Sequence, residues 1–317
     1  MTLASLPLSF YRTVAVIFGL LWGSFLNVVI HRMPREESVV SPGSKCACGT
    51  PIPAYRNIPV ISWLLMGGKA PCCGVKVSPR YVIVEILGGL LSLAVFEVLV
   101  RDLGPGTPIG RAALVYVSHF AVCCILLAAT FIDFEWMIIP DELNYGAALL
   151  GAATFWFRGM SIVDVVVGGI LPPLGLWLFT KGYAKLRGID GMGMGDFKLL
   201  VAVGAWFGWK GTVFVIFAGA VQGTLAAVAM RLTGGSIPLP PNVQAELDEV
   251  RKLAEEGTPE EQEEAKKILE EELLTQVDGS FGRSALPMGP FLVLGFYEWL
   301  FAHDVILERF QSFTMPG

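Results

Sequence analysis

Long apolar segments recur along most of the 317-residue chain, separated by shorter polar stretches. A helix that crosses a lipid bilayer needs about 20 mostly apolar residues. Eight segments approach that requirement, of which the sixth is the shortest and has the weakest borders. They cover residues 10–31, 82–100, 112–132, 137–157, 162–182, 196–209, 211–232 and 286–304. The pattern predicts an all-α polytopic membrane protein with about eight transmembrane helices.

The composition supports this prediction and excludes several classes of protein. Hydrophobic residues make up 54% of the chain and charged residues only 16%, whereas a typical soluble domain has roughly 25% charged residues. So few charges cannot cover the surface of a soluble protein of this length. The net charge is −5, and no basic patch with interleaved aromatic residues is present. We therefore expect a lipid bilayer as the partner surface and no binding to nucleic acid.

Basic residues are concentrated in alternate loops, which indicates how the chain is oriented. Lys and Arg accumulate in cytoplasmic loops. Seven follow the first predicted span, three follow the fifth and six follow the seventh, whereas the loops after the second, fourth and sixth hold two, one and one. Odd-numbered spans are therefore expected to end in the cytoplasm, with both chain termini outside.

Two polar insertions divide the chain into parts. One insertion carries four cysteines, and the other holds thirteen acids and four bases between residues 241 and 278. Helical periodicity in the acidic insertion predicts a solvated hairpin over residues 243–253 and 260–274. The expected parts are a first transmembrane helix (1–32), a cytoplasmic cysteine module (33–80), a transmembrane core (81–235), an acidic cytoplasmic insertion (236–284), and a last transmembrane helix with a tail (285–317).

Acidic residues at the ends of predicted spans mark the candidate chemistry. Asp133 ends an apolar run, and Asp196 follows three glycines in the sequence Gly-Met-Gly-Met-Gly-Asp. Each Gly weakens a helix by roughly 1 kcal/mol relative to Ala. Irregular backbone at membrane depth persists only inside protein or beside a water-filled cavity. The run therefore predicts a wet pocket edged by a carboxylate, although a loop in which Asp196 only caps a helix fits the spacing equally well.

Two carboxyl groups that share a pocket can perform acid–base chemistry. Like charges at close range resist simultaneous ionisation, so the pair holds one proton between them. The ionised member can take a proton from water while the protonated member polarises a peptide carbonyl, as in aspartic proteases.

Several motifs of this chain, in order from about residue 15 to residue 300, resemble those of bacterial type 4 prepilin peptidases. The Gly-Met-Gly-Asp sequence at 193–196 also resembles the signature of the GxGD intramembrane aspartyl proteases, to which that family belongs. The remaining motifs lie at residues 23–34, 57–63, 80–85, 133 with 139–141, and 286–292.

The resemblance implies an intramembrane aspartyl endopeptidase of the bacterial inner membrane, with its active site toward the cytoplasm. Such enzymes cleave the basic leader from prepilins or pseudopilins at a Gly–Phe type junction. Matching the motifs residue by residue implies Asp133 and Asp196 as the catalytic pair, with Gly193 and Gly195 supporting the catalytic loop. Asp141 is expected to cap the following helix.

The resemblance also implies a second activity. Many members methylate the new N-terminus with S-adenosylmethionine, and this function is associated with the cytoplasmic module. The Gly-Lys position linked to it is Gly68-Lys69 here. Acids near the dyad, namely Glu135, Asp141 and Glu142, are hypothesised to bind the basic leader of the substrate.

The cysteine pattern of the module suggests a metal ion. Cys46 and Cys48 form one cluster and Cys72 and Cys73 a second. A reducing compartment disfavours disulfides, and four thiolates suit a structural zinc ion. The family usually has two Cys-x-x-Cys pairs, so a distorted zinc site is predicted, with a metal-free module as the alternative.

Two other functions match parts of the pattern. A proton-coupled transporter would also use intramembrane acids and broken helices, but it predicts inverted repeats and a site at the bilayer midplane. A non-enzymatic assembly factor predicts that both aspartates are dispensable.

Overall fold

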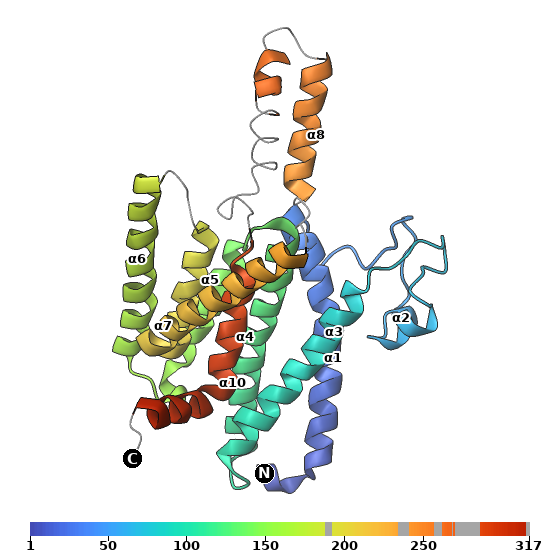
Figure 1. Ribbon diagram of the computed structural model, residues 1–317. Coiled ribbons are helices and arrows are strands. Elements are labelled where there is room, and N and C mark those ends of the chain that lie inside the picture. Colours follow the sequence, from blue (N-terminus) through green and yellow to red (C-terminus); the bar gives the residue numbers. More distant parts are fainter. Residues whose placement is uncertain (188–191, 234–240, 257–261, 268, 270–285, 315–317) are drawn as a thin grey trace.

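The computed structural model of the chain describes residues 1–187, 192–233, 241–256, 262–267, 269 and 286–314 (Figure 1). Within these residues the fold is helical, with isolated β-bridges and no strand, which confirms the expected all-α class. The helices are α1 (Leu8–Arg32), α2 (Ile61–Leu65), α3 (Arg80–Ala94), α4 (Ile109–Trp136), α5 (Asp141–Thr154), α6 (Ile162–Arg187), α7 (Met194–Thr233), α8 (Pro241–Glu256) and α10 (Gly289–Thr314).

Five helical segments within the described residues are long and apolar enough to cross a membrane, so the chain is a multi-pass membrane protein. They are Leu8–Arg35, Arg80–Leu103, Ile109–Trp136, Ile162–Leu186 and Met194–Thr233. The predicted fourth span is the 14-residue α5 followed by a short 3-10 turn. The predicted sixth and seventh spans are two arms of α7, which bends at Gly208. The count of eight spans remains a prediction.

The helices pack as two groups with α10 between them. In one group α1 packs on α3, and in the other α6 packs on α7. Helix α10 contacts both α4 and α7, and its Phe296 ring lies against the ring of Phe207, tilted by 42°, with ring centroids 4.5 Å apart. The most deeply buried side chains, including Ile132, Leu200 and Trp206, lie where these helices meet.

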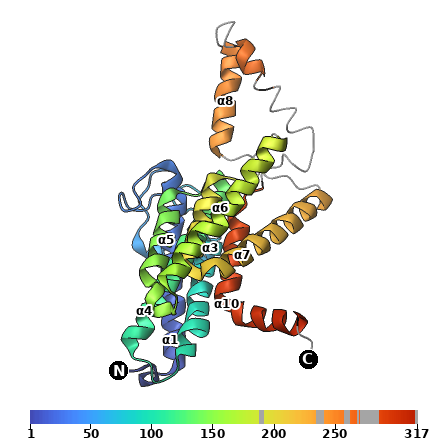
Figure 2. The same ribbon diagram turned by 90° about the vertical axis from the view of Figure 1, so that its left-hand side faces the viewer.

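Helix α7 has the shape of a V. Gly208 has φ +66° and ψ −170°, which interrupts the helical backbone, and Figure 2 shows the second arm slanting away from the bundle. The second arm runs along α10, because a Cβ at Gly223 would lie 3.3 Å from the sulfur of Met288. The first turn of α7, which faces Asp133, and Gly223 in the second arm therefore both lie near the start of α10.

An arginine stabilises the bend of α7. Arg158 follows α5 and donates hydrogen bonds to the carbonyls of Gly151, Ala205 and Trp206. Its guanidinium also lies 4.4 Å from the centre of the Trp206 ring. Carbonyl groups beside an irregular turn at membrane depth need such donors because lipid offers none.

The acidic hairpin projects from the same end of the bundle as the cysteine module (Figures 1 and 2). Its first predicted helix is confirmed as α8, and residues 262–267 are helical as well. Of the predicted second helix (260–274), residues 260, 261, 268 and 270–274 lie outside the described residues.

Helices α6 and α7 approach so closely that glycine is required at their contact. A Cβ at Gly204 would overlap the carbonyl oxygen of Gly168, and a Cβ at Gly168 would overlap the backbone of Gly208. Small residues at such crossings allow dispersion contacts between backbones, which stabilise helix pairs in lipid.

We predict that Gly168→Ala lowers stability by roughly 1–3 kcal/mol, because the two backbones must separate to admit the methyl group. The midpoint of thermal unfolding in detergent measures the effect. Gly175→Ala in the same helix is the matched control, since its Cβ would meet nothing within 4 Å. Equal midpoints for the two variants would contradict the close packing.

Candidate active site

The structure brings Asp133 and Asp196 together, although they lie on different helices. Asp133 is in the last turn of α4 and Asp196 in the first turn of α7. Their exposed fractions are 5% and 8%. The two carboxyl groups lie close enough to interact electrostatically. Both predicted acids therefore share one buried polar niche.

The turn after α4 holds Asp133 in place. Helix α4 ends at Met137, whose φ of +52° is left-handed, and the Met137 N–H donates to the carbonyl of Asp133 at 2.9 Å. Pro140 then begins α5. Between these residues Ile139 is only 8% exposed and forms an apolar wall of the niche.

The glycine turn before α7 holds Asp196. The Gly193 N–H donates to Asp196 Oδ2 at 3.2 Å, and the Asp196 N–H donates to the Gly193 carbonyl at 3.2 Å. This contact resembles half of a capping box, so the helix-capping interpretation and the pocket interpretation are both partly right. A Cβ at Gly195 would lie only 3.3 Å from Cβ of Ile139, which explains the second glycine of the motif.

Two further residues contact the niche, and the sequence analysis gave neither a role. The Gly289 N–H, at the start of α10, donates to Asp133 Oδ2 at 3.0 Å. The N-terminal end of a helix favours such a negative group. Asn144 of α5 donates to the Gly195 carbonyl at 3.3 Å, while its buried Oδ1 lacks a protein partner. An unmatched buried acceptor indicates a polar site that can hold water.

Two ion pairs flank the niche. Arg80 pairs with Glu135 at 2.5 Å, and Lys198 pairs with Asp141 at 2.6 Å.

The expectation that Asp141 caps α5 is wrong. The N-cap residue is Pro140, no side chain caps the helix, and the Asp141 carboxylate binds Lys198 instead.

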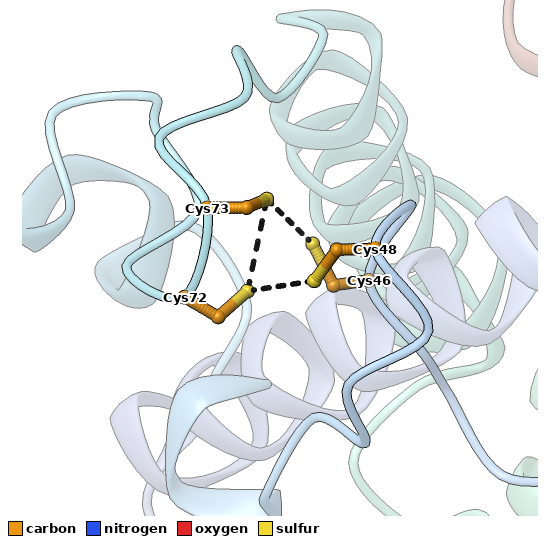
Figure 3. A group of neighbouring side chains, drawn as sticks. All are labelled: Cys46, Cys48, Cys72 and Cys73. Atoms are coloured by element: carbon orange, nitrogen blue, oxygen red, sulfur yellow. Dashed lines mark hydrogen bonds between the residues drawn. The ribbon is translucent and has the colours of Figure 1, made fainter.

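Four cysteine sulfurs converge in the module between α1 and α3 (Figure 3). All four lie within 4.8 Å of one another. The sulfur atoms lie 3.6 Å apart in Cys46–Cys73, 3.4 Å apart in Cys48–Cys72 and 3.9 Å apart in Cys72–Cys73. Cys46, Cys48, Cys72 and Cys73 thus have the arrangement of a metal site. Cys123 and Cys124 are buried in α4, as packing residues would be.

Hydrogen bonds give the cysteines unequal acidities. Bonds from the side chain and backbone of Thr50 lower the pKa of Cys48 to about 6. Hydrogen bonds to Cys46 and Cys48 raise the pKa of the Cys72 thiol to about 12. A thiol that donates to a neighbouring sulfur keeps its proton, and a bound cation would replace such protons.

Gly68 and Lys69 line a small groove beside Trp63. Gly68 has φ +69°, and a Cβ there would lie 2.9 Å from Cζ2 of Trp63. Glycine at this position therefore permits both the turn and the close approach of the indole.

Comparisons with known proteins show the family to which this chain is related. Residues 17–99 match the bacterial peptidase A24 N-terminal domain, and residues 120–228 match the type IV leader peptidase family. A protein of Aeromonas hydrophila named prepilin leader peptidase/N-methyltransferase is 35% identical over 249 residues, covering 70% of this chain and 82% of its own length. The chain belongs to the type IV leader peptidase family.

Other relatives agree with this assignment. Proteins with the same name from Neisseria gonorrhoeae and Stutzerimonas stutzeri are 32% and 35% identical, and the matches cover 70% and 75% of this chain and 83% and 89% of theirs. No solved structure matches the chain. As a member of the leader peptidase family, the chain is an enzyme. The matched domains include the motif regions at residues 23–34, 80–85 and 133–141.

We predict that Gly289→Ala reduces peptidase activity at least about tenfold, because its Cβ would lie 2.5 Å from Asp133 Oδ2 and force that carboxyl to move. Turnover under saturating substrate measures the effect. The control is Gly146→Ala, whose nearest neighbour would be Ile125 at 3.8 Å. Unchanged turnover in folded Gly289→Ala protein would show that α10 does not position the acid.

Proposed function

We propose that the chain is an intramembrane aspartyl endopeptidase that removes the leader of prepilins or pseudopilins and then methylates the new N-terminus. The juxtaposition of Asp133 and Asp196 in one buried niche carries the peptidase part. The name of the relatives supports both activities. A transporter site would lie near the bilayer midplane, whereas both acids lie at helix ends.

In the proposed reaction the dyad shares one proton. The ionised carboxyl takes a proton from a water molecule as that water attacks the scissile carbonyl carbon. The protonated carboxyl donates a hydrogen bond to the carbonyl oxygen. The tetrahedral intermediate then breaks at its C–N bond, and the amine of the new N-terminus takes the proton that the first carboxyl received from water, which leaves the dyad with one proton again. Backbone N–H groups of Gly193 and Gly289 hold the two carboxyls in position.

The proposed orientation places the niche, the cysteine module and the acidic hairpin at the cytoplasmic face of the bacterial inner membrane. All three lie at one end of the bundle (Figure 1), and that end carries the loops rich in Lys and Arg. We retain the five-part division at residues 1–32, 33–80, 81–235, 236–284 and 285–317 as a working hypothesis.

The structure modifies the hypothesis for leader binding. Glu135 and Asp141 already pair with Arg80 and Lys198, whereas Glu142 is exposed. A basic leader would contact Glu142 directly and would have to compete with Arg80 or Lys198 for the other two acids.

We further propose that the cysteine cluster binds zinc as a structural ion. Four sulfurs around zinc lie about 3.8 Å apart when each bond is about 2.3 Å. Three of the sulfur pairs are separated by 3.4 to 3.9 Å, and all four sulfurs lie within 4.8 Å of one another. Zinc held by these four side chains would join the two ends of a module whose only α-helix within the described residues is the five-residue α2.

For methylation, bound S-adenosylmethionine would supply the methyl group of its sulfonium. The amine nitrogen of the new N-terminus would accept that group as the carbon–sulfur bond breaks, leaving a thioether and releasing one proton. The resemblance links Gly68 and Lys69 to this activity. We propose that Gly68 contributes by allowing the indole of Trp63 to lie close to it.

We predict that Asp133→Asn and Asp196→Asn each reduce leader cleavage by about three orders of magnitude or more, because neither variant retains a carboxyl pair. Purified protein is incubated with a prepilin, and the product is measured by mass spectrometry. Asp164→Asn is the control, because the Asp164 carboxylate accepts its hydrogen bonds from Ser161 at the start of α6, away from the dyad. Cleavage by either dyad variant at the rate of the control would refute the dyad.

We predict about one zinc ion per purified chain and a clear loss of zinc in Cys72→Ser, because a hydroxyl is a much weaker ligand for zinc than a thiolate. Elemental analysis measures the metal. Cys124→Ala, which changes a cysteine in α4 instead, should retain it. A wild-type protein purified without chelators that holds no zinc would favour the metal-free module.

A further inference from the structure

The cysteine module exposes a group of large apolar side chains along helix α2 and just before it. Their exposed fractions rise from 46% to 84% in the order Ile58, Ile61, Leu64 and Leu65. These four residues are named the α2 edge. Apolar groups gathered at one place on a surface mark contact with a protein partner or a membrane.

The opposite side of α2 is fixed to the rest of the module. Ser62 is buried, and its hydroxyl accepts a hydrogen bond from the Ile58 N–H at 3.0 Å. The Trp63 indole is half-buried and donates its N–H to the Val77 carbonyl at 3.1 Å. The members of the edge that belong to α2 recur at positions i, i+3 and i+4, which lie on one face of a helix. The edge is therefore a fixed apolar face that points away from the module.

A hydrogen bond places α2 below the end of the transmembrane bundle. The N–H of Val60, which directly precedes α2, donates to the Glu85 carboxylate at 2.7 Å. Glu85 lies five residues after Arg80, the first residue of α3, which is roughly 7.5 Å along the helix axis. Figure 1 shows α2 beside the first turns of α3.

This position corresponds to the surface layer of a bilayer. Arginine at the end of a spanning helix extends into the polar headgroups, and that layer is about 5–7 Å thick on each side. A segment roughly 7.5 Å below Arg80 thus lies where headgroups meet acyl chains. Near the same level α3 exposes Ile83 and Ile86, so the α2 edge continues the apolar surface of a spanning helix.

The charges of the module fit a lipid surface as well. Residues 38–79 contain four bases and no acid. Two of these bases, Arg56 and Lys69, are exposed and lie within four residues of the edge in the sequence. Anionic headgroups attract such bases, and bases beside an apolar face are typical of segments that lie in the membrane interface.

We propose that the α2 edge inserts into the leaflet nearest the module and anchors the module in the membrane interface. That leaflet is the cytoplasmic one in the orientation proposed above. The depth of α2 favours lipid over a water-soluble partner, and the bases beside the edge would repel the basic leader of a prepilin. The module, expected to be cytoplasmic over residues 33–80, is then partly embedded in lipid. The inference is independent of both proposed activities.

The test is photochemical cross-linking of the full chain in nanodiscs of phosphatidylethanolamine and phosphatidylglycerol. The photoreactive amino acid p-benzoylphenylalanine replaces Leu65, and mass spectrometry identifies what it labels. The control is the same replacement at Val40, which is 86% exposed against 84% for Leu65 but lies eight residues after the end of α1. We expect at least about tenfold more lipid adduct at position 65, because only the edge reaches the acyl chains.

Equal lipid labelling at the two positions, or no lipid adduct at position 65, would overturn the inference. Labelling of a second copy of the chain or of an added prepilin in place of lipid would show that the edge is a protein interface instead.

A measurement on the wild-type protein covers the case in which a variant fails to fold. A phospholipid that carries a diazirine in its acyl chain near the headgroup should label peptides that contain residues 58–65. Peptides with Ile83 and Ile86, which are exposed on a spanning helix, are the internal standard. Label in the standard but not in residues 58–65 would contradict insertion.

Discussion

The architecture depends on two acidic side chains being held side by side where lipid would otherwise exclude them. Burying carboxyl groups is costly unless they receive hydrogen bonds. Here the donors are backbone N–H groups at Gly193 and Gly289, and both belong to helix starts. Helices α4, α7 and α10 must therefore come together at the dyad. The bend of α7 and the central position of α10 are both compatible with this arrangement.

Sequence patterns predicted the parts of this arrangement that depend on local chemistry. Apolar runs located α1, α3, α4 and α6 within a few residues, because a bilayer imposes both length and composition on a spanning helix. The break near residue 210 was interpreted as a loop, but the structure shows a bend in one helix at Gly208. Composition alone cannot distinguish a glycine that ends a helix from one that bends it.

The candidate site was predictable only in part for a similar reason. Motifs identified Asp133 and Asp196, because each has a distinctive neighbourhood in the sequence. Gly289 lies 156 residues from the carboxyl it contacts, and only tertiary packing reveals that contact. A signal was present in Pro287-Met288-Gly289-Pro290, where a glycine between prolines begins a helix, but it does not name the partner. The ion pair of Asp141 with Lys198 also could not be predicted from the sequence, because it too depends on tertiary packing.

The V shape of α7 determines which part of this helix a reagent on the far side of the membrane can reach. Because the first turn of α7 and Gly223 in its second arm both lie near the start of α10, the polypeptide reverses direction at Gly208, and the bend exposes Trp209 and Lys210. In the orientation proposed above, an antibody, protease or membrane-impermeant label applied from outside the cell would meet this part of α7 only as a short bend, at which Arg158 binds the carbonyl and the ring of Trp206. In that orientation Asp196, in the first turn of α7, lies a full helix arm away from the outward-facing bend, so reagents on the outer side would not reach the dyad through it.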